Sequence, residues 1–239
     1  MSVSLKGQGC VVVGASSGMG FSIAAAFARE GARVVAAARR TERLDALKKE
    51  GDVTPLACDV AKRKDVETFA AAALKALKKV DVLVYASGTN IPERTMATLK
   101  PETWDEMIAV NLTGAFDVTR AFLPSIRASG GAHLIYISSI AGRTADNVSG
   151  PSYQAAKRGL AGLALGLRLE ERKHGVRACV IYPGLCDTEI LTKRPAPTPA
   201  DVLAQALKPE DVADAVLAVA KMHPRVAVTE LEIVPAKLQ

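Results

Sequence analysis

Short apolar runs alternate with amphipathic segments along the whole chain. The apolar runs predict strands at residues 10–13, 33–38, 54–58, 80–85, 133–138, 177–182 and 230–234. Between them, apolar positions at helical spacing predict helices at residues 18–30, 42–50, 61–79, 102–129, 153–174 and 209–222. Runs that are apolar at consecutive positions are typical of strands that are covered on both faces.

This alternation of strand and helix predicts the fold class. It indicates a parallel α/β sheet with right-handed crossovers. Neither a linker nor an internal repeat divides the chain, so we expect one Rossmann-type domain over residues 1–239. Its doubly wound sheet should have about seven strands, with helices on both faces. The proline-containing stretch 192–201 is expected to be a mobile loop.

Charge and composition narrow the choice of partners. The formal net charge is +6, but Lys and Arg are scattered among Asp and Glu. A nucleic-acid partner is therefore not expected, whereas a basic cleft would attract an anionic cofactor. The four cysteines form no CxxC pair and the three histidines are isolated, so we expect no metal. No run is long enough to span a bilayer and no signal peptide is evident, which predicts a cytoplasmic protein without a membrane partner.

A glycine-rich turn follows the first predicted strand. Gly14 would permit the tight turn, Gly18 would let the backbone approach a pyrophosphate, and Gly20 would let the next helix pack on the sheet. The helix N-terminus would then offer N–H groups to phosphate. A glycine-rich turn without a ligand is the alternative, but the position between first strand and first helix favours a dinucleotide.

The end of the second strand indicates which dinucleotide is bound. An NAD-binding unit usually carries Asp or Glu there, whereas this chain has Arg39 and Arg40. A guanidinium binds a 2′-phosphate by charge-assisted hydrogen bonds, so we predict NADP(H) as the cofactor. The alternative is that both arginines are solvated charges.

Ser139, Tyr153 and Lys157 form the second chemical signal. Tyr153 and Lys157 are four residues apart and share a helix face. A nearby ammonium stabilises a phenolate, so we expect a lowered pKa for Tyr153, suited to acid–base work. Ser139 ends the fifth strand, and Asn111 lies in the preceding long helix.

Together these motifs resemble the short-chain dehydrogenase/reductase family. The resemblance covers nearly the whole chain and rests on GASSGMG, Asp59-Val60, VNLTGAF, ISSIAG, YQAAK and YPGLCDT in the order of the family. It implies that Tyr153 is the general acid or base and that Lys157 lowers its pKa and holds the nicotinamide ribose. It also implies that Ser139 stabilises the reacting oxygen and that Asn111 holds a water in a proton relay.

The resemblance also implies a set of residues that contact the cofactor from the glycine loop to the nicotinamide end. They are Gly14, Ser16, Ser17, Gly18, Met19, Gly20, Arg39, Arg40, Asp59, Val60, Ala86, Gly88, Tyr153, Lys157, Pro183, Gly184, Cys186 and Thr188.

Two positions depart from the family pattern. The usual Asn-Asn-Ala-Gly turn after the fourth strand is Tyr85-Ala86-Ser87-Gly88 here, so Gly88 is retained and the asparagine side chains are not. Backbone contacts to the cofactor are expected to persist, and local support for the sheet is expected to weaken. The spacing from Ser139 to Tyr153 is one residue longer than usual, which indicates an insertion within residues 143–150. Spacing from Asn111 favours Ser139 over Ser138 as the catalytic serine.

The expected substrate is a small carbonyl compound or secondary alcohol. Loop residues near its expected position are either solvated charges or ligands for a hydroxy or keto acid, namely Arg94, Arg143, Asn147, Lys193 and Arg194. Residues 224–233 resemble the tail of NADP-dependent 3-hydroxy acid and serine dehydrogenases. A 3-oxoacyl-thioester reductase is the enzymatic alternative, and a non-catalytic NADP-binding sensor or scaffold is the alternative of another class. Apolar surface on helices 102–129 and 153–174 predicts a homodimer or homotetramer.

Overall fold

A single parallel sheet organises the chain. The structure is a computed structural model that describes residues 2–238. Its seven strands are hydrogen-bonded in the order β3-β2-β1-β4-β5-β6-β7, and every pairing is parallel. This confirms the predicted Rossmann-type fold. The strands are β1 (Gly9–Val13), β2 (Arg33–Ala38), β3 (Val53–Ala57), β4 (Val82–Tyr85), β5 (His133–Ile137), β6 (Arg177–Pro183) and β7 (Glu230–Ile233).

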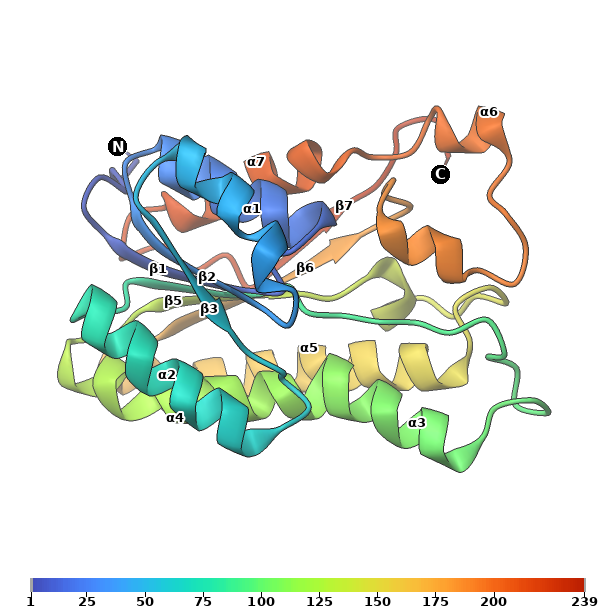
Figure 1. Cartoon of the computed structure of the whole chain (residues 1–239), viewed down its shortest axis with the longest axis horizontal. Helices are drawn as coiled ribbons and strands as arrows, with labels where there is room; N and C mark the ends of the chain where they lie inside the picture. The colour runs from blue at the N-terminus through green and yellow to red at the C-terminus, as the bar shows by residue number, and fades with distance from the viewer. Residues whose placement is uncertain (1, 239) are drawn as a thin grey trace.

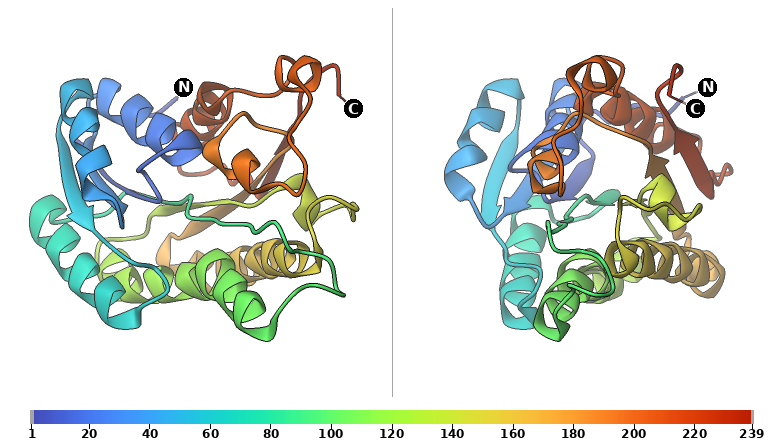
Figure 2. Two further views of the ribbon diagram at one scale, coloured as in Figure 1. Left: turned by 45° about the vertical axis from the view of Figure 1, so that its right-hand side comes forward. Right: turned by 90° about the vertical axis from the view of Figure 1, so that its right-hand side faces the viewer.

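Helices cover both faces of the sheet (Figure 1). On one face lie α1 (Gly18–Arg29) and α7 (Pro209–Ala220), which pack against each other. On the other lie α2 (Arg63–Leu77), α4 (Gly114–Ala128) and α5 (Pro151–Glu171), and the turned views of Figure 2 show the same layers. The chain leaves β1 toward β2 and β3, then returns to β4 on the other side of β1. This reversal opens a crevice at the carboxyl ends of β1 and β4, where ligands bind in such sheets.

Two apolar clusters hold these layers together. Successive side chains of a strand point to opposite faces. Val11 and Val13 accordingly join the cluster under α2, α4 and α5, whereas Cys10 and Val12 join the cluster under α1 and α7. All five residues of β1 are buried. The runs of apolar residues seen in the sequence therefore reflect a sheet with no solvent-facing side at its centre.

Two predicted helices differ from those in the structure. Residues 42–50 form two 3-10 turns, η1 (Thr41–Arg43) and η2 (Asp45–Glu50). The long helix expected at residues 102–129 is divided into α3 (Pro101–Ile108), a π-helical turn η3 (Ala109–Thr113) and α4. The Tyr85 hydroxyl donates a hydrogen bond of 2.6 Å to the Val110 carbonyl in this turn. A polar group that inserts into the helical ladder accounts for the interruption.

His133, at the start of β5, makes the stability of the fold depend on pH. Its side chain is 1% exposed, and neither ring nitrogen has a hydrogen-bond partner among residues 2–238. Burial, with a smaller contribution from Arg177, lowers the pKa of His133 to about 3. The native protein therefore keeps this ring neutral, while the unfolded chain takes up a proton near pH 6.5. The resulting stability is complete above pH 6.5 and is lost as the pH falls from there toward 3.

A His133→Leu variant should lose less stability in acid than the wild type. Between pH 7 and pH 5 the wild type should lose about 2 kcal/mol more of its unfolding free energy than the variant does. Urea unfolding at the two pH values measures this difference. His174→Leu, at a half-buried position in the turn η5 (Arg172–His174), serves as the control and should not reproduce it. Equal losses in wild type and His133→Leu would contradict the prediction.

Candidate active site

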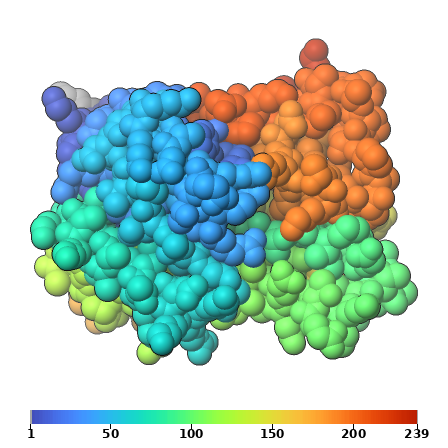
Figure 3. All heavy atoms as spheres, in the orientation of Figure 1, coloured from blue at the N-terminus to red at the C-terminus, as the bar shows by residue number. Residues whose placement is uncertain are grey.

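One open cleft of about 380 Å³ lies at the carboxyl ends of the central strands. It is lined by the turn after β1, the end of β2, the segment after β4 and the first turns of α5. The segment after β6, with the 3-10 turn η6 (Glu189–Lys193), completes its wall. Figure 3 shows that residues near 190 meet residues near 40 on the molecular surface, so that the two segments bridge one side of the cleft.

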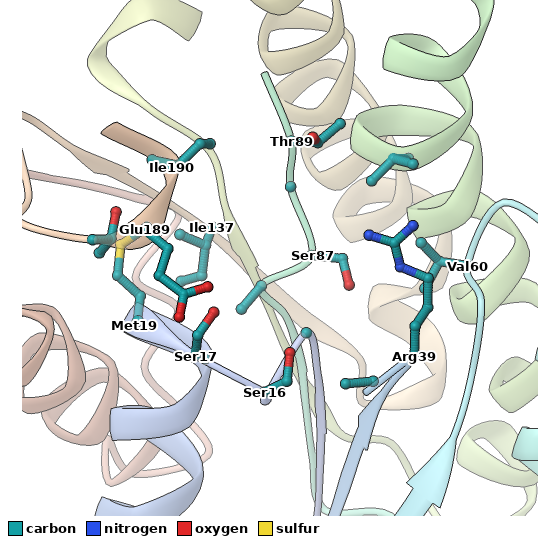
Figure 4. A pocket seen from close by; sticks show the side chains of 18 of the residues that line it. Ser16, Ser17, Met19, Arg39, Val60, Ser87, Thr89, Ile137, Glu189 and Ile190 are labelled. Carbon is teal, nitrogen blue, oxygen red and sulfur yellow. The ribbon is translucent and has the colours of Figure 1, made fainter. Parts of the chain in front are cut away.

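The glycine loop forms the floor of the cleft. Gly14 has a φ of +91°, and a Cβ built on it would lie 2.5 Å from the Ser87 nitrogen. No other residue therefore fits between the ends of β1 and β4. Ser17 is the N-cap of α1 and makes no side-chain capping hydrogen bond, which leaves N–H groups of the first helical turn available. Figure 4 shows the side chains of Ser16 and Ser17, which belong to this loop, in the cleft.

Two arginines lie at the other end of this loop. Arg39 lines the cleft beside Val60, as Figure 4 shows. Arg40 donates hydrogen bonds of 3.4 Å to the Ser16 and Ser17 hydroxyls and an ion pair of 3.3 Å links it to Glu189. Arg43 donates to the same carboxylate at 2.5 Å. This end of the cleft is thus positively charged and is bridged to η6 by one carboxylate.

Tyr153 and Lys157 stand on the first two turns of α5 and both line the cleft. The Lys157 ammonium lies 5.6 Å from the centre of the Tyr153 ring and donates to the Ile137 carbonyl at 3.0 Å. Ser139, after β5, is close enough to Tyr153 to lower the pKa of its hydroxyl. Ser138 donates to the Lys157 carbonyl at 3.0 Å and lines the cleft, whereas Ser139 is not part of the lining, so the choice of Ser139 over Ser138 stays a prediction.

Asn111 is held in the π-helical turn η3. It is fully buried, accepts a hydrogen bond of 3.2 Å from the Thr89 nitrogen and donates to the Thr89 and Met107 carbonyls. A Cβ on Gly88 would lie 3.1 Å from the Asn111 Oδ1 and 3.3 Å from the Lys157 Nζ. The Asn111 amide and the Lys157 ammonium therefore approach the same glycine, which survives in the altered turn after β4.

Burial decides the protonation of this site. It raises the pKa of Tyr153 to about 12, although the Ser139 hydrogen bond and the charge of Arg94 lower it. The expectation of a lowered phenol pKa is therefore wrong for this chain by itself, because the cost of burying a phenolate is larger. Burial also lowers the pKa of Lys157 to about 8. At neutral pH the phenol and the ammonium both carry their protons.

A family comparison places this geometry in context. The family model for short chain dehydrogenases matches residues 8–198. The chain belongs to the short chain dehydrogenase family of oxidoreductases.

Known proteins resemble this short-chain dehydrogenase over most of its length. It is 35% identical to the glycine betaine reductase ATRR of Emericella nidulans over 97% of the chain, but it spans only 19% of that protein. It is 30% identical to the 3-oxoacyl-acyl-carrier-protein reductase FabG of Thermotoga maritima, over 89% of this chain and 90% of that one. A metagenomic short-chain oxidoreductase solved in complex with NADP superposes with a TM-score of 0.84 at 35% identity, covering 98% and 99% of the two chains.

The cleft of this short-chain dehydrogenase collects most of the residues expected at the cofactor. Three of the expected residues do not line it: Pro183, Gly184 and Cys186. The Gly184 nitrogen donates to the Ile233 carbonyl beside β7, and Cys186 is 6% exposed. Besides Lys193, which the sequence analysis names as a loop charge, the lining includes residues that the motifs did not indicate, namely Ser87, Thr89, Glu189, Ile190 and Thr192. No motif marks them, because loops from distant parts of the sequence bring them here.

The loop charges proposed for an acidic substrate are dispersed in this short-chain dehydrogenase. Lys193 lines the cleft and donates to the Thr89 hydroxyl at 2.8 Å. Arg143 lies outside the cleft lining, paired with Glu232 at 3.3 Å and 5.2 Å from the centre of the Tyr182 ring. Arg194 donates to the Thr198 hydroxyl, and Arg94 donates hydrogen bonds to backbone carbonyls. Asn147 is exposed and also lies outside the lining. Only one of these five side chains therefore lines the cleft.

Residues 2–238 of this short-chain dehydrogenase offer neither a cluster of metal ligands nor a membrane-spanning helix. No group of three or more His, Cys, Asp or Glu side chains in that range lies close enough to hold a metal ion. No helix in that range combines the length and the apolar character that crossing a membrane requires.

Proposed function

We propose that this short-chain dehydrogenase uses NADP(H) to interconvert a carbonyl compound and a secondary alcohol. The observation that carries the proposal is one cleft with two chemically different ends. Tyr153 and Lys157 line one end, with Ser139 near Tyr153, and Arg39 and Arg40 lie at the other. The residues of the glycine loop line the same cleft as both ends.

The residues of this cleft fit a dinucleotide phosphate. The space beside Gly14 that a Cβ would close, and the uncapped first turn of α1, suit a pyrophosphate. Arg39 would hold the 2′-phosphate together with Arg40, which pairs with Glu189 of η6 in the chain by itself. The residues directly after β2 include no Asp or Glu that would bind the ribose hydroxyls of NAD instead. The NADP complex of the metagenomic relative supports this choice. When bound, NADPH supplies a hydride to a carbonyl carbon.

The protein side of the reaction is a proton transfer. In reduction, Tyr153 would give its hydroxyl proton to the carbonyl oxygen, and its pKa of about 12 keeps that proton in place at neutral pH. Ser139 would donate a hydrogen bond to the same oxygen. Lys157 would balance the charge left on the phenol, and Asn111 would hold a water for proton return. In oxidation the phenolate would act as the base.

A substrate screen tests the proposal. Purified protein should consume NADPH with at least one member of a panel of simple ketones, 3-oxo acids and 3-oxoacyl esters. Turnover with 3-oxoacyl esters alone would favour the 3-oxoacyl-thioester reductase, which the likeness to FabG supports. Turnover of acids that falls in a Lys193→Met variant, with ketone turnover unchanged, would favour a small keto acid. NADPH binding without turnover of any panel member would favour the sensor or scaffold.

The cofactor preference depends on Arg39. Replacing it with Ala should raise the KM for NADPH by roughly 10- to 100-fold, because a hydrogen bond to a charged group contributes about 1.5–3 kcal/mol. The KM for NADH should stay within about twofold, since NADH has no 2′-phosphate for a guanidinium to bind. Steady-state kinetics with both dinucleotides measure this. Arg143→Ala, outside the cleft lining, is the control, and equal changes for NADPH and NADH would contradict the assignment.

Assembly and location stay predictions. Phe116 on α4 and Leu169 on α5 are 42% and 56% exposed, which supports the homodimer or homotetramer proposed for these helices. Light scattering tests it. The cytoplasmic location is tested by cell fractionation. The predicted likeness of the tail to 3-hydroxy acid and serine dehydrogenases is not shown by the relatives named above.

A further inference from the structure

Arg94 is a buried cation in the segment that follows β4. Its residue is 4% exposed. Burying a guanidinium is costly unless partners satisfy it, and a carboxylate is the usual partner. Within residues 2–238, however, no carboxylate forms an ion pair with Arg94. The side chain must therefore be held in another way.

Three backbone carbonyls take the place of a carboxylate. The Arg94 Nε donates to the Ile91 carbonyl at 2.5 Å, and Nη1 donates to the Val148 carbonyl at 3.2 Å. Nη2 donates to the Lys193 carbonyl. These acceptors belong to the segment after β4, to the loop before α5 and to the end of η6. A planar guanidinium with several fixed donors joins three segments at once, which a lysine ammonium on its flexible stem would do less well.

Neighbouring contacts tie the same three segments together. The Asn90 amide donates to the Ser149 carbonyl at 3.2 Å, and the Lys193 ammonium donates to the Thr89 hydroxyl at 2.8 Å. Thr89 and Lys193 both line the cleft. Arg94 thus lies behind the wall of the cleft at the end where Tyr153 stands, instead of inside it.

Arg94 also packs against the start of α5. Gly150 is the N-cap of α5 and has a φ of +80°. A Cβ on Gly150 would lie 2.7 Å from the Arg94 carbonyl oxygen and 2.8 Å from the Arg94 Cβ. The helix therefore begins in direct contact with Arg94, and Tyr153 follows three residues later. A shift of Arg94 would move the turn that presents the phenol.

Several charged and polar groups surround the phenol. Besides Lys157 on α5 and Ser139 after β5, they are Arg94 and Asp146. The positive charge of Arg94 lowers the pKa of Tyr153, whereas the negative charge of Asp146 raises it. Burial and the nearby Arg194 lower the pKa of Arg94. It remains a cation at neutral pH, because an arginine pKa starts above 12.

We propose that Arg94 is a positioning residue that joins the three segments around the cleft and sets the first turn of α5, so that Tyr153 meets its substrate. The proposal rests on the proposed function for the role of Tyr153. The joining of the three segments stands on the contacts alone, so it is tested without a substrate.

The first test is hydrogen exchange. In an Arg94→Met variant, amides in peptides covering residues 144–152 and 189–194 should exchange at least about tenfold faster than in the wild type, because their shared anchor is gone. Arg143→Met removes an exposed arginine of the same loop and is the matched control, with no change expected beyond its own surroundings. Arg94→Lys keeps the charge without the three-way span and should be intermediate. Unchanged exchange in Arg94→Met would overturn the proposal.

The second test is kinetic. Arg94→Met should lower kcat at least about tenfold while the Kd for NADPH, measured by calorimetry, stays within about twofold. In oxidation at saturating NADP⁺, so that the cofactor complex and not the chain by itself is titrated, the rise of kcat/KM for the alcohol with pH should move up by about one pH unit in Arg94→Met but not in Arg94→Lys. A loss of stability alone would not move this limb. An unchanged kcat and limb in Arg94→Met would overturn the proposal, whereas a wild type without any turnover would count against the proposed function only.

Discussion

A Tyr153→Phe variant should bind NADPH as the wild type does but lose roughly 10²- to 10⁴-fold of its carbonyl-reducing activity. The substitution removes the hydroxyl that donates the proton and keeps the ring. Burial holds the pKa of Tyr153 at about 12, so the wild-type hydroxyl is protonated throughout the neutral range. The loss should therefore appear in kcat.

Calorimetry and steady-state kinetics separate binding from turnover in this experiment. Tyr182→Phe is the matched control, because the Tyr182 hydroxyl donates to Glu230 and Tyr182 does not line the cleft. That variant should keep wild-type turnover. If Tyr153→Phe retained more than about a tenth of the wild-type kcat, a different group would have to supply the proton.

A Lys157→Met variant should lose roughly 10- to 10³-fold in kcat/KM. An opposite charge within a few ångströms shifts a pKa by about one to three units, and each unit is a factor of ten in the stability of the phenolate. The Lys157 ammonium lies 5.6 Å from the centre of the Tyr153 ring. Methionine has a similar length and carries no charge. Both kcat and the KM for NADPH should change, since Lys157 is expected to contact the ribose as well.

The fold should survive this substitution. Burial lowers the pKa of Lys157 to about 8, so the folded protein holds its proton less tightly than the unfolded chain does. The buried charge therefore opposes folding at neutral pH, and this cost shrinks as the pH rises through 8 toward 10.5. Thermal unfolding should show a Tm for Lys157→Met equal to or above that of the wild type at pH 7. Lys208→Met, which removes an exposed lysine paired with Asp187, is the control and should keep full activity. Full activity in Lys157→Met would contradict the assigned role.

Local sequence patterns determined much of this protein. Apolar runs and helical spacing were enough to predict a parallel sheet covered on both faces. This is because the apolar residues that each strand or helix buries are visible in its own sequence. Gly14 was identified from its place in a strand–turn–helix unit, and Tyr153 and Lys157 from a spacing of four residues. Each of these motifs is formed by residues that are close together in the sequence. They can therefore be recognised without knowing which distant residues pack against them.

Contacts between distant segments decided the rest. The long predicted helix is broken at Val110, where the Tyr85 hydroxyl, at the end of β4, donates a hydrogen bond to the Val110 carbonyl. The expected fall in the pKa of Tyr153 is reversed by burial, which is a property of packing. Arg94 and Arg143 look alike as loop charges, yet one is buried among carbonyls and the other pairs with Glu232. The sequence by itself determined the strands and most of the helices, and it predicted which residues carry the chemistry. Only the tertiary structure decided their solvation and partners, because both depend on residues that are far apart along the chain.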